Sequence, residues 1–543
     1  MISDILKKIP SKVFFLLSFL IILGIYLFQT RTFWFYINDD AYITFRYSLN
    51  FSQGKGPYFN PGEFVEGYSN FLLMVILIPF FWVTNTEIIP FIAKGIGIFS
   101  GILCLGLVFF LGKFLAEREK DLESEASWIG VFSAALLATC PSFAVNSTSG
   151  LETLLYSFLI TAGVYFTLIP WNQKNWFLPG IFFSLSILTR PEAPFIFGCF
   201  WISYFFMSWL KDKSFSNKKF WLNFLMVVGT FAFHLLFRVF IYEGEIFPNT
   251  FYAKSGGFWK IGAWDYIQKG LFDPFFGFVG MGAAFLGVAR IFSFRNEIFP
   301  VSAIFVSGGV LIFIVGTDWM LGWRFVAPFL PVASVLVGIG WALIIKRLSF
   351  KPHWILALIF FSLIPLIWLH QDITREKMKR LINVRALGYK RGHMELSNWI
   401  HQNTKTGDTI ALMDIGIIGY ENPQLKILDF TGLTDRHVAK SQGHFLDKQF
   451  DLKYIFNQKP EFIILVCNAK RLSNNAIELH HHNPIEEKIY SHPEFKRFYM
   501  ADPHNFKSKG STLEGIARKF GSVSSFLQQD HYLLMAFKRK TPT

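Results

Sequence analysis

Long apolar runs separated by short polar connections make up most of the first 370 residues of the chain. A helix of roughly 17 to 25 apolar residues is long enough to cross the hydrocarbon core of a bilayer. The pattern therefore predicts about eleven membrane-spanning helices. They are expected near residues 13–28, 88–115, 128–145, 153–169, 176–189, 193–210, 221–242, 271–292, 298–316, 325–345 and 353–370.

One further apolar run, residues 71–83, is short and contains Pro79. If this run does not cross the membrane, the basic clusters at 211–219, 290–295 and 346–351 fall on the same side as the N-terminal lysines. Lys and Arg gather in cytoplasmic connections of membrane proteins. We therefore expect a re-entrant or juxtamembrane segment on the outer face, with the N-terminus in the cytoplasm and the C-terminus outside.

The pattern changes after residue 370. Residues 371–391 form a basic amphipathic stretch, which is typical of a helix on a membrane surface. Beyond it, the periodicity predicts a helix at 394–402 and short buried strands at 409–414, 425–430 and 461–466. We expect two domains: a transmembrane domain, residues 1–370, with a first outer loop at about 31–70, and an extracytoplasmic α/β domain, residues 371–543.

Composition supports a membrane protein. Of the 543 residues, 52% are hydrophobic and 18% aromatic, which excludes an ordinary soluble protein. The formal net charge of +14 is typical of contacts with lipid phosphate, since no nucleic-acid-binding module is visible. The four cysteines show no disulfide framework and no metal-ligand spacing, and the three histidines at 480–482 lack acidic or cysteine partners. No metal site is predicted.

The most unusual polar stretch is residues 38–70, which holds the adjacent acids Asp39 and Asp40. Acids at a membrane surface are costly unless they have a task or a partner. Two structural interpretations compete with a functional one: a polar loop flanking the membrane, or an Asp N-cap that opens a short helix. In such a helix Asp39, Ile43 and Arg46 share a face, which would let Arg46 orient Asp39.

With the expected topology, all connections of unusual residue content fall on the outer face. Besides the first loop they are TSGLET at 148–153, TRPE at 189–192, YEGEIFPNTFYAK at 242–254 and GTDWMLGWR at 316–324. Carboxylates and cations together suit group transfer from a lipid-linked phosphate. A carboxylate removes a proton from an attacking hydroxyl, and cations stabilise the charge that develops on the leaving phosphate.

These residues carry a resemblance to a known family. The first loop NDDAYITFRYSLNFSQGKGPYFNPGEFVEGYSN, then SGLET, RPE, GEIFPNTFYAK and GTDWM with Arg324, resemble bacterial GT-C glycosyltransferases related to the mycobacterial terminal arabinofuranosyltransferase of the cell wall. The pattern continues as DIGIIGY at 414–420 and DFTGLTD at 429–435. Several motifs in this order are specific for the family, but not for the sugar.

The resemblance implies a polytopic α-helical GT-C-like protein that takes its sugar from a polyprenyl phosphate, with Asp39 or Asp40 as the base. The implied contacts to the donor phosphate are Arg46, Arg190, Lys254 and Arg324. The implied contacts to the sugar or the acceptor are Glu66, Tyr68, Glu152, Glu192, Asn249, Tyr252, Asp318 and Trp319. Glu192 at a helix start and Asn249 after a proline also have ordinary structural explanations.

The expected activity is an inverting transfer of a sugar to a hydroxyl of an envelope glycan, lipid or protein at the bacterial inner membrane. Arabinofuranose, another pentose and a hexose all remain open as the sugar, and so does assistance by a divalent cation. The main alternative is a transporter or flippase of a lipid-linked sugar. A flippase would place ionisable residues along a path through the bilayer and would show internal repeats. The chain shows neither, which favours the transferase.

Overall fold

The computed structural model describes residues 11–212, 217–254, 262–275, 296–347, 354–471, 477–481, 483–501 and 530–540. Outside these ranges lie most of the expected span at 271–292, the basic cluster at 290–295, parts of the clusters at 211–219 and 346–351, the lysines at 7 and 8, and His482. The chain forms two compact units. The helical unit comprises Met1–Trp34, Ala93–His234 and Trp259–Met378, and the α/β unit comprises Phe35–Ile92, Leu235–Phe258 and Lys379–Thr543.

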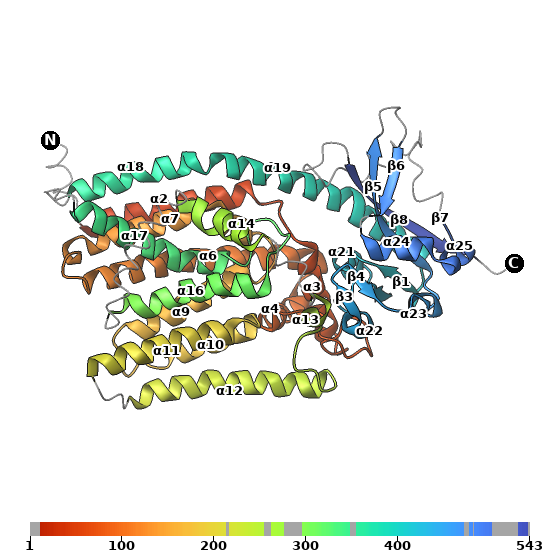
Figure 1. Ribbon diagram of the computed structural model, residues 1–543, viewed down its shortest axis with the longest axis horizontal. Coiled ribbons are helices and arrows are strands. Elements are labelled where there is room, and N and C mark those ends of the chain that lie inside the picture. Colours follow the sequence, from red (N-terminus) through yellow and green to blue (C-terminus); the bar gives the residue numbers. More distant parts are fainter. Residues whose placement is uncertain are drawn as a thin grey trace. The chain divides into compact units, whose positions relative to one another are not determined.

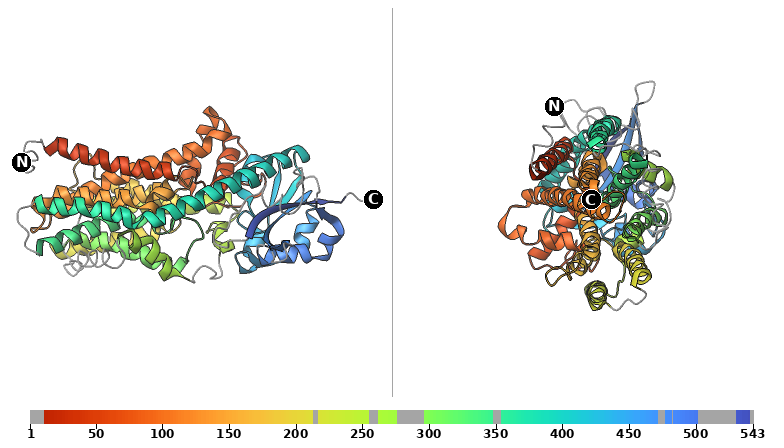
Figure 2. Two further views of the ribbon diagram at one scale, coloured as in Figure 1. Left: turned by 90° about the horizontal axis from the view of Figure 1, so that it is seen from above. Right: turned by 90° about the vertical axis from the view of Figure 1, so that its left-hand side faces the viewer.

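The helical unit is a bundle whose long helices run alongside one another (Figures 1 and 2). Its helices are α2 (Ser11–Thr32), α6 (Ile89–Glu117), α7 (Ala126–Thr139), α8 (Pro141–Ser147), α9 (Thr153–Leu168), α10 (Leu178–Thr189), α11 (Ala193–Asp212), the larger part of α12 (Lys218–Ile241), α14 (Ala263–Ile267), α16 (Ile298–Val315), α17 (Leu330–Arg347) and α18 (Trp354–His370). Among the described long apolar helices, α17 is the most enclosed, because 83% of its most apolar segment is buried.

Six helices in the described ranges are long and apolar enough to cross a membrane, or up to seven if the bent pair Glu123–Thr139 and Pro141–Ser147 forms one span. This number is lower than the eleven spans expected, largely because three apolar helices are short: α9 has 16 residues, α10 has 12 and α18 has 17. The bent pair breaks at Cys140, whose ψ of 113° is extended. The residue before a proline is disfavoured in the helical conformation, so Pro141 accounts for the break.

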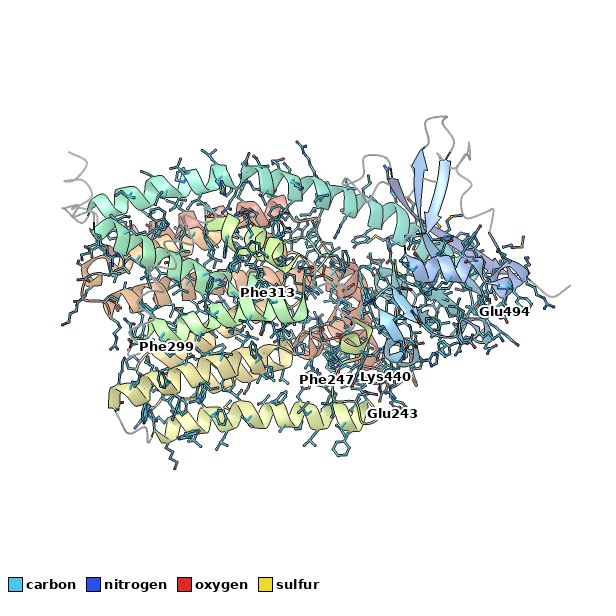
Figure 3. All side chains as sticks on the ribbon, in the orientation of Figure 1. Glu243, Phe247, Phe299, Phe313, Lys440 and Glu494 are labelled. Carbon is cyan, nitrogen blue, oxygen red and sulfur yellow. The ribbon has the colours of Figure 1, made fainter. Side chains whose placement is uncertain are left out.

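Exposed apolar side chains on α16 are typical of a surface that faces lipid. Phe313, which Figure 3 labels, is 53% exposed, and Val306 and Ile314 on the same helix are also exposed. In water such a row would be unfavourable, whereas lipid acyl chains are as apolar as these side chains.

The α/β unit contains a mixed sheet with strand order β2-β1-β5-β8-β7, and β6 also pairs with β5. Strand β1 (Thr409–Leu412) is parallel to β2 (Lys426–Asp429) and to β5 (Phe462–Arg471), whereas β8 (Asp530–Arg539) is antiparallel to β5. Strands β6 (Ile477–His481) and β7 (Tyr499–Ala501) complete it. The structure confirms the three strands that the sequence predicts.

Successive residues of a strand point to opposite faces of the sheet. Helices pack against both of these faces. On one face, Ala411 and Ile463 pack with residues of α23 (Lys453–Asn457), α24 (Pro484–Ser491) and α25 (Pro493–Phe498). On the other face, Phe462 contacts Trp399 of α20 (Glu395–Asn403) with ring centroids 5.0 Å apart. The parallel strands β1 and β2 are joined by α21 (Ile415–Glu421).

Residues 35–70 of the first outer loop lie in the compact α/β unit together with residues 379–543. The loop opens with α3 (Asp39–Ser52), and the short apolar run forms α4 (Phe71–Leu77) and α5 (Phe80–Val83), interrupted at Pro79. Residues after α12 form a turn and α13 (Asn249–Lys254), which contacts α22 (Arg436–Lys440). Figure 3 labels Glu243 and Phe247 of this turn and Lys440 of α22.

Candidate functional site

Asp39 is a buried acid at the start of α3. Its Oδ2 accepts a hydrogen bond from the N–H of Gly416 at 3.0 Å, and its Oδ1 accepts one from the N–H of Ile417 at 2.8 Å. These two N–H groups are among the donors that the first turn of α21 leaves without partners inside the helix. Burial raises the pKa of Asp39 to about 6, against the lowering effect of His393. Asp39 therefore caps a helix of the C-terminal region.

Asp40, its neighbour, is half-buried. Its backbone N–H donates to the side chain of Asn38, the N-cap residue of α3, at 3.0 Å. The N-cap interpretation of this stretch thus holds for Asn38 rather than for either aspartate. Of the two adjacent acids, Asp40 is the more exposed.

Arg46 does not orient Asp39, although the two lie on the same helix. Its guanidinium group is fully buried and donates to the carbonyl oxygens of Phe59 at 2.8 Å, Gly419 at 2.7 Å and Leu425 at 2.8 Å. A charged donor that serves several buried carbonyls removes the penalty of leaving them without partners. This arrangement assigns Arg46 to the connection between the first loop and α21, and leaves its guanidinium little capacity for a phosphate.

The glycines of the DIGIIGY motif let α21 approach α3 closely. A Cβ atom on Gly416 would lie 2.0 Å from the carbonyl oxygen of Asp39, and one on Gly419 would lie 2.9 Å from the ring of Phe59. Helices α3 and α21 are in contact, and the Cβ position of Gly419 also lies 3.2 Å from Nη1 of Arg46. The motif is therefore explained by packing.

His393, from a π-helical turn at Tyr389–Met394, is buried beside Asp414, the residue preceding α21. Its Nε2 lies 2.9 Å from Oδ2 of Asp414. Burial lowers the pKa of His393, but the hydrogen bond and charge of Asp414 and the charge of Asp39 raise it, and the net shift is upward. Sequence patterns did not single out His393, because a lone histidine in a helical stretch carries no signal of its distant partners.

Glu66, Tyr68 and Asn249 lie in the interior of the α/β unit. Glu66 forms a buried ion pair with Arg238, with Oε2 and Nε 2.9 Å apart, and burial raises the pKa of Glu66 to about 7 against the effect of Arg238. The hydroxyl of Tyr68 lies 3.0 Å from that of Tyr242.

Asn249 donates from Nδ2 to the carbonyl oxygens of Gly432 at 2.7 Å and Leu433 at 3.1 Å. These contacts join YEGEIFPNTFYAK to DFTGLTD. In the latter motif the buried Asp429 accepts hydrogen bonds from the backbone N–H groups of Thr431 and Thr434. Both motifs thus contribute to folding of the unit.

Lys254 and Tyr252 are more accessible. The ammonium of Lys254 lies 5.7 Å from the ring centroid of Phe445, and no carboxylate of a described residue lies within ion-pair distance of it. The ammonium of Lys440 lies 5.1 Å from the ring centroid of Tyr252. Of the two predicted phosphate ligands in the α/β unit, Lys254 is the more exposed, whereas Arg46 is fully buried.

The helical unit gathers charged side chains from three separate motifs. Arg190, at the end of α10, donates from Nη1 to Glu152 at 2.6 Å and from Nε to Glu192 at 2.7 Å. Glu152 precedes α9, so its negative charge is next to a helix N-terminus, whereas Arg190 follows a helix C-terminus. Both placements are favoured by the helix dipole.

Arg324 completes this charged cluster. Its Nε lies 2.7 Å from Oδ2 of Asp318, and its guanidinium is 5.2 Å from the ring centroid of Phe325. The guanidinium of Arg190 is 5.4 Å from the same ring, so Phe325 contacts both cations. Trp319 is 42% exposed and offers an aromatic face.

The charges of the cluster shift the pKa values of its members. Burial raises the pKa of Glu152, but the positive charges of Arg190 and Arg324 lower it by more, and the net pKa lies below the ordinary value. Desolvation lowers the pKa of Arg190, and Glu192 and Glu152 raise it by more. The described members are Glu152, Arg190, Glu192, Asp318 and Arg324, which is three acids with two cations. We call these five residues the helical charge cluster.

No group of three or more histidine, cysteine or acidic side chains in the described part of the chain is arranged to hold a metal ion. The acids of the helical charge cluster are held by arginines instead. Chemically, the cluster offers guanidinium groups suited to a phosphate and carboxylates suited to hydroxyl groups.

Comparisons with known proteins agree with this fold. A family model described as a domain of unknown function, DUF8728, matches residues 382–513, which is less than half of the chain. No curated protein sequence matches the chain. The crystal structure of ArnT from Cupriavidus metallidurans in the apo state is similar with a TM-score of 0.50 at 10% identity, covering 84% of this chain and 93% of that one. The structure of the same protein bound to undecaprenyl phosphate is similar with a TM-score of 0.46 at 11% identity, covering 77% and 86%. At these identities the likeness concerns the fold alone: the chain is a polytopic helical membrane protein with a C-terminal α/β region, and its fold resembles that of apo ArnT.

Proposed function

We propose that the protein is an inverting membrane glycosyltransferase that moves a sugar from a polyprenyl-phosphate donor to a hydroxyl of an envelope glycan, lipid or protein. The observation that carries this proposal is the helical charge cluster, because three motifs from distant parts of the sequence meet there. Buried ionisable groups at the ends of apolar helices are costly and are functional in most membrane proteins. The fold shared with apo ArnT is consistent with the proposal.

In the proposed reaction Asp40 is the base. It removes the proton of the acceptor hydroxyl while the acceptor oxygen bonds to the anomeric carbon, and the bond from that carbon to the phosphate oxygen breaks. The electron pair of this bond remains on the phosphate. Two observations favour Asp40 over Asp39: Asp40 is half-buried, whereas Asp39 is buried and both of its carboxylate oxygens accept hydrogen bonds from α21. A base must be able to reach the proton that it removes.

Arg190 and Arg324 are the proposed ligands of the leaving phosphate, since cations stabilise the charge that develops there. The donor phosphate would compete with Glu152 and Asp318 for the two arginines. In this proposal, donor binding therefore breaks at least one of these ion pairs. Asp318, Glu152 and Glu192 would then accept hydrogen bonds from sugar hydroxyls, with Trp319 against the sugar ring. Arg46, Glu66, Tyr68 and Asn249 are assigned to the fold because their contacts lie within the α/β unit.

We further propose that the protein resides in the bacterial inner membrane with the α/β unit on the extracytoplasmic side. The motifs resemble arabinofuranosyltransferases, which makes arabinofuranose the first sugar to test, followed by other pentoses and hexoses. Membranes that contain the protein are incubated with a labelled polyprenyl-phosphate sugar, and transfer to an envelope acceptor is measured.

The decisive variants are Asp40→Asn and Asp39→Asn. Loss of a general base lowers the rate by about 10² to 10⁴-fold, which is expected for Asp40→Asn without loss of the folded protein. Asp39→Asn is expected to lower thermal stability as well as rate. Full transfer by Asp40→Asn would refute the base assignment. Absence of transfer from every lipid-linked sugar by the wild-type protein, together with movement of such a lipid across the bilayer, would favour the flippase.

A further inference from the structure

Two buried hydroxyl groups at the start of α9 have no part in the reaction described so far. Thr153 is 2% exposed and Tyr156 is 0% exposed, yet neither side-chain oxygen has a hydrogen-bond partner among the described residues. A buried hydroxyl that lacks a partner is unfavourable, and such groups are rare in native proteins. The pair therefore points to a ligand that carries hydrogen-bonding groups.

The buried hydroxyls further along the same helix do have partners. Ser157, Thr161 and Thr167 each donate to a carbonyl oxygen, at 3.4, 2.7 and 2.7 Å. For Thr161 and Thr167 this oxygen belongs to the residue four positions earlier, which is the usual partner of a hydroxyl inside a helix. The two hydroxyls without a described partner thus lie together in the first turns of α9, next to Glu152.

This end of α9 carries part of the helical charge cluster. The backbone N–H of Tyr156 donates to the carbonyl oxygen of Glu152 at 2.9 Å, so the two side chains lie one turn apart on the same face. Helical side chains lean toward the N-terminus of their helix, which directs Tyr156 toward the turn that holds Glu152. Glu152 is 2.6 Å from Nη1 of Arg190, and the charges of Arg190 and Glu192 act on the Tyr156 hydroxyl.

The chemistry at this end of α9 suits a sugar better than an anion. A hydroxyl side chain can both donate and accept, and a carboxylate accepts from a hydroxyl, so Thr153, Tyr156 and Glu152 together match the groups of a sugar ring. The described cluster contains three acids and two cations. Beside two of those acids, Glu152 and Glu192, an anion would be repelled, whereas a neutral ring would not.

We propose that Tyr156 and Thr153 bind hydroxyl groups of the transferred sugar and are specificity-determining residues for the donor. This rests on the proposed function, since it names further contacts of the same donor. Glu152 is the N-cap residue of α9, so donor binding that breaks its ion pair with Arg190 uncovers the first turn of the helix. Sugar hydroxyls then supply the hydrogen bonds that the protein without donor leaves unmade.

The test is Tyr156→Phe, which removes the hydroxyl and keeps the ring. Affinity is measured for the polyprenyl-phosphate sugar that the wild type transfers, and for polyprenyl phosphate without a sugar. A sugar hydroxyl left without its partner weakens binding of the first lipid by about 5- to 100-fold, whereas binding of the second should not change. Tyr165→Phe is the control, because Tyr165 is a half-buried residue further along α9. Unchanged affinity for the sugar donor, or equal weakening for both lipids, would overturn the proposal.

A second measurement needs no substrate and separates this inference from the proposed function. Without donor, Tyr156→Phe should unfold at the wild-type temperature or above, because the hydroxyl that it removes has no described partner. Tyr26→Phe is the matched comparison: Tyr26 is also 0% exposed, but its hydroxyl donates to the carbonyl oxygen of Ile98 at 3.3 Å, so this variant should unfold earlier.

Equal destabilisation by Tyr156→Phe and Tyr26→Phe would contradict the proposal even if sugar transfer were observed. Thr153→Val serves as the second variant in both measurements, with the same expected results. A wild type that transfers a lipid-linked sugar, with unchanged donor affinity in Tyr156→Phe and Thr153→Val, would overturn this inference alone. A wild type that transfers none would overturn the proposed function, whatever the stability of the variants.

Discussion

The carboxylate of Asp39 accepts a hydrogen bond from the backbone N–H of Gly416, although the two residues are 377 positions apart in the chain. A residue of the first outer loop thus closes the N-terminus of α21. Arg46 repeats the connection two turns further along α3, where it donates to the carbonyl oxygen of Gly419 at 2.7 Å. The loop and the C-terminal region therefore fold as one unit.

The contact between α3 and α21 leaves no room for a side chain at Gly416. Gly416→Ala would place a Cβ atom 2.0 Å from the carbonyl oxygen of Asp39. Overpacking of this kind costs about 1–3 kcal/mol, and we expect an earlier thermal unfolding transition of the α/β unit, measured by tryptophan fluorescence. Gly95→Ala is the control, since nothing lies within 4 Å of its Cβ position. Equal stability of the two variants would contradict the contact.

Arg46→Met should be among the most destabilising substitutions in the unit. It leaves the carbonyl oxygens of Gly419 and Leu425 buried without donors, and each loss costs about 1–3 kcal/mol. Arg436→Met is the matched comparison, because Arg436 is half-buried and its pair with Glu243 is partly exposed, which is worth about 0–1 kcal/mol. Limited proteolysis of the two variants provides the measurement. A similar cleavage rate in both would assign Arg46 a smaller structural role.

Arg190→Gln should reduce sugar transfer more than stability would explain. The change leaves Glu152 and Glu192 without their cation and removes a proposed phosphate ligand, and loss of one such stabilising group lowers the rate by about 10² to 10³-fold. Lys211→Gln, which breaks the more exposed pair with Glu297, should leave the rate unchanged. Rates are compared at saturating donor. If Arg190→Gln retained full activity, the helical charge cluster would be structural only.

The stability of the α/β unit should fall as pH rises from about 4 to about 6. Burial raises the pKa of Asp39 from 3.8 to about 6, so in this window the folded state binds more protons than the unfolded state. Stability then decreases with rising pH. In Asp39→Asn this part of the dependence should be absent, so the thermal unfolding temperatures of variant and wild type should diverge least at pH 6 and above. A parallel pH dependence in both proteins would mean that Asp39 titrates with an ordinary pKa.

Several elements were predictable because their signals are local. Apolar runs such as Ile298–Val315 indicate a span by length and composition, and short β-branched runs such as Phe462–Val466 indicate buried strands. The motifs around Glu152, Arg190 and Asp318 were also visible, and the helical unit brings them together. By contrast, Arg46 was expected beside Asp39 from helical spacing alone, and spacing says nothing of the carbonyl groups supplied by α21.

The sequence by itself determined the class of this protein: a membrane helix needs only enough consecutive apolar residues, and an α/β region only the right periodicity, both of which are properties of neighbouring positions. Tertiary structure decided which of the two adjacent acids caps a helix and which is more exposed, and which arginine serves the fold. Those outcomes depend on burial and on hydrogen-bond partners hundreds of residues away, because the free energy of a buried charge is set by the groups that surround it in space.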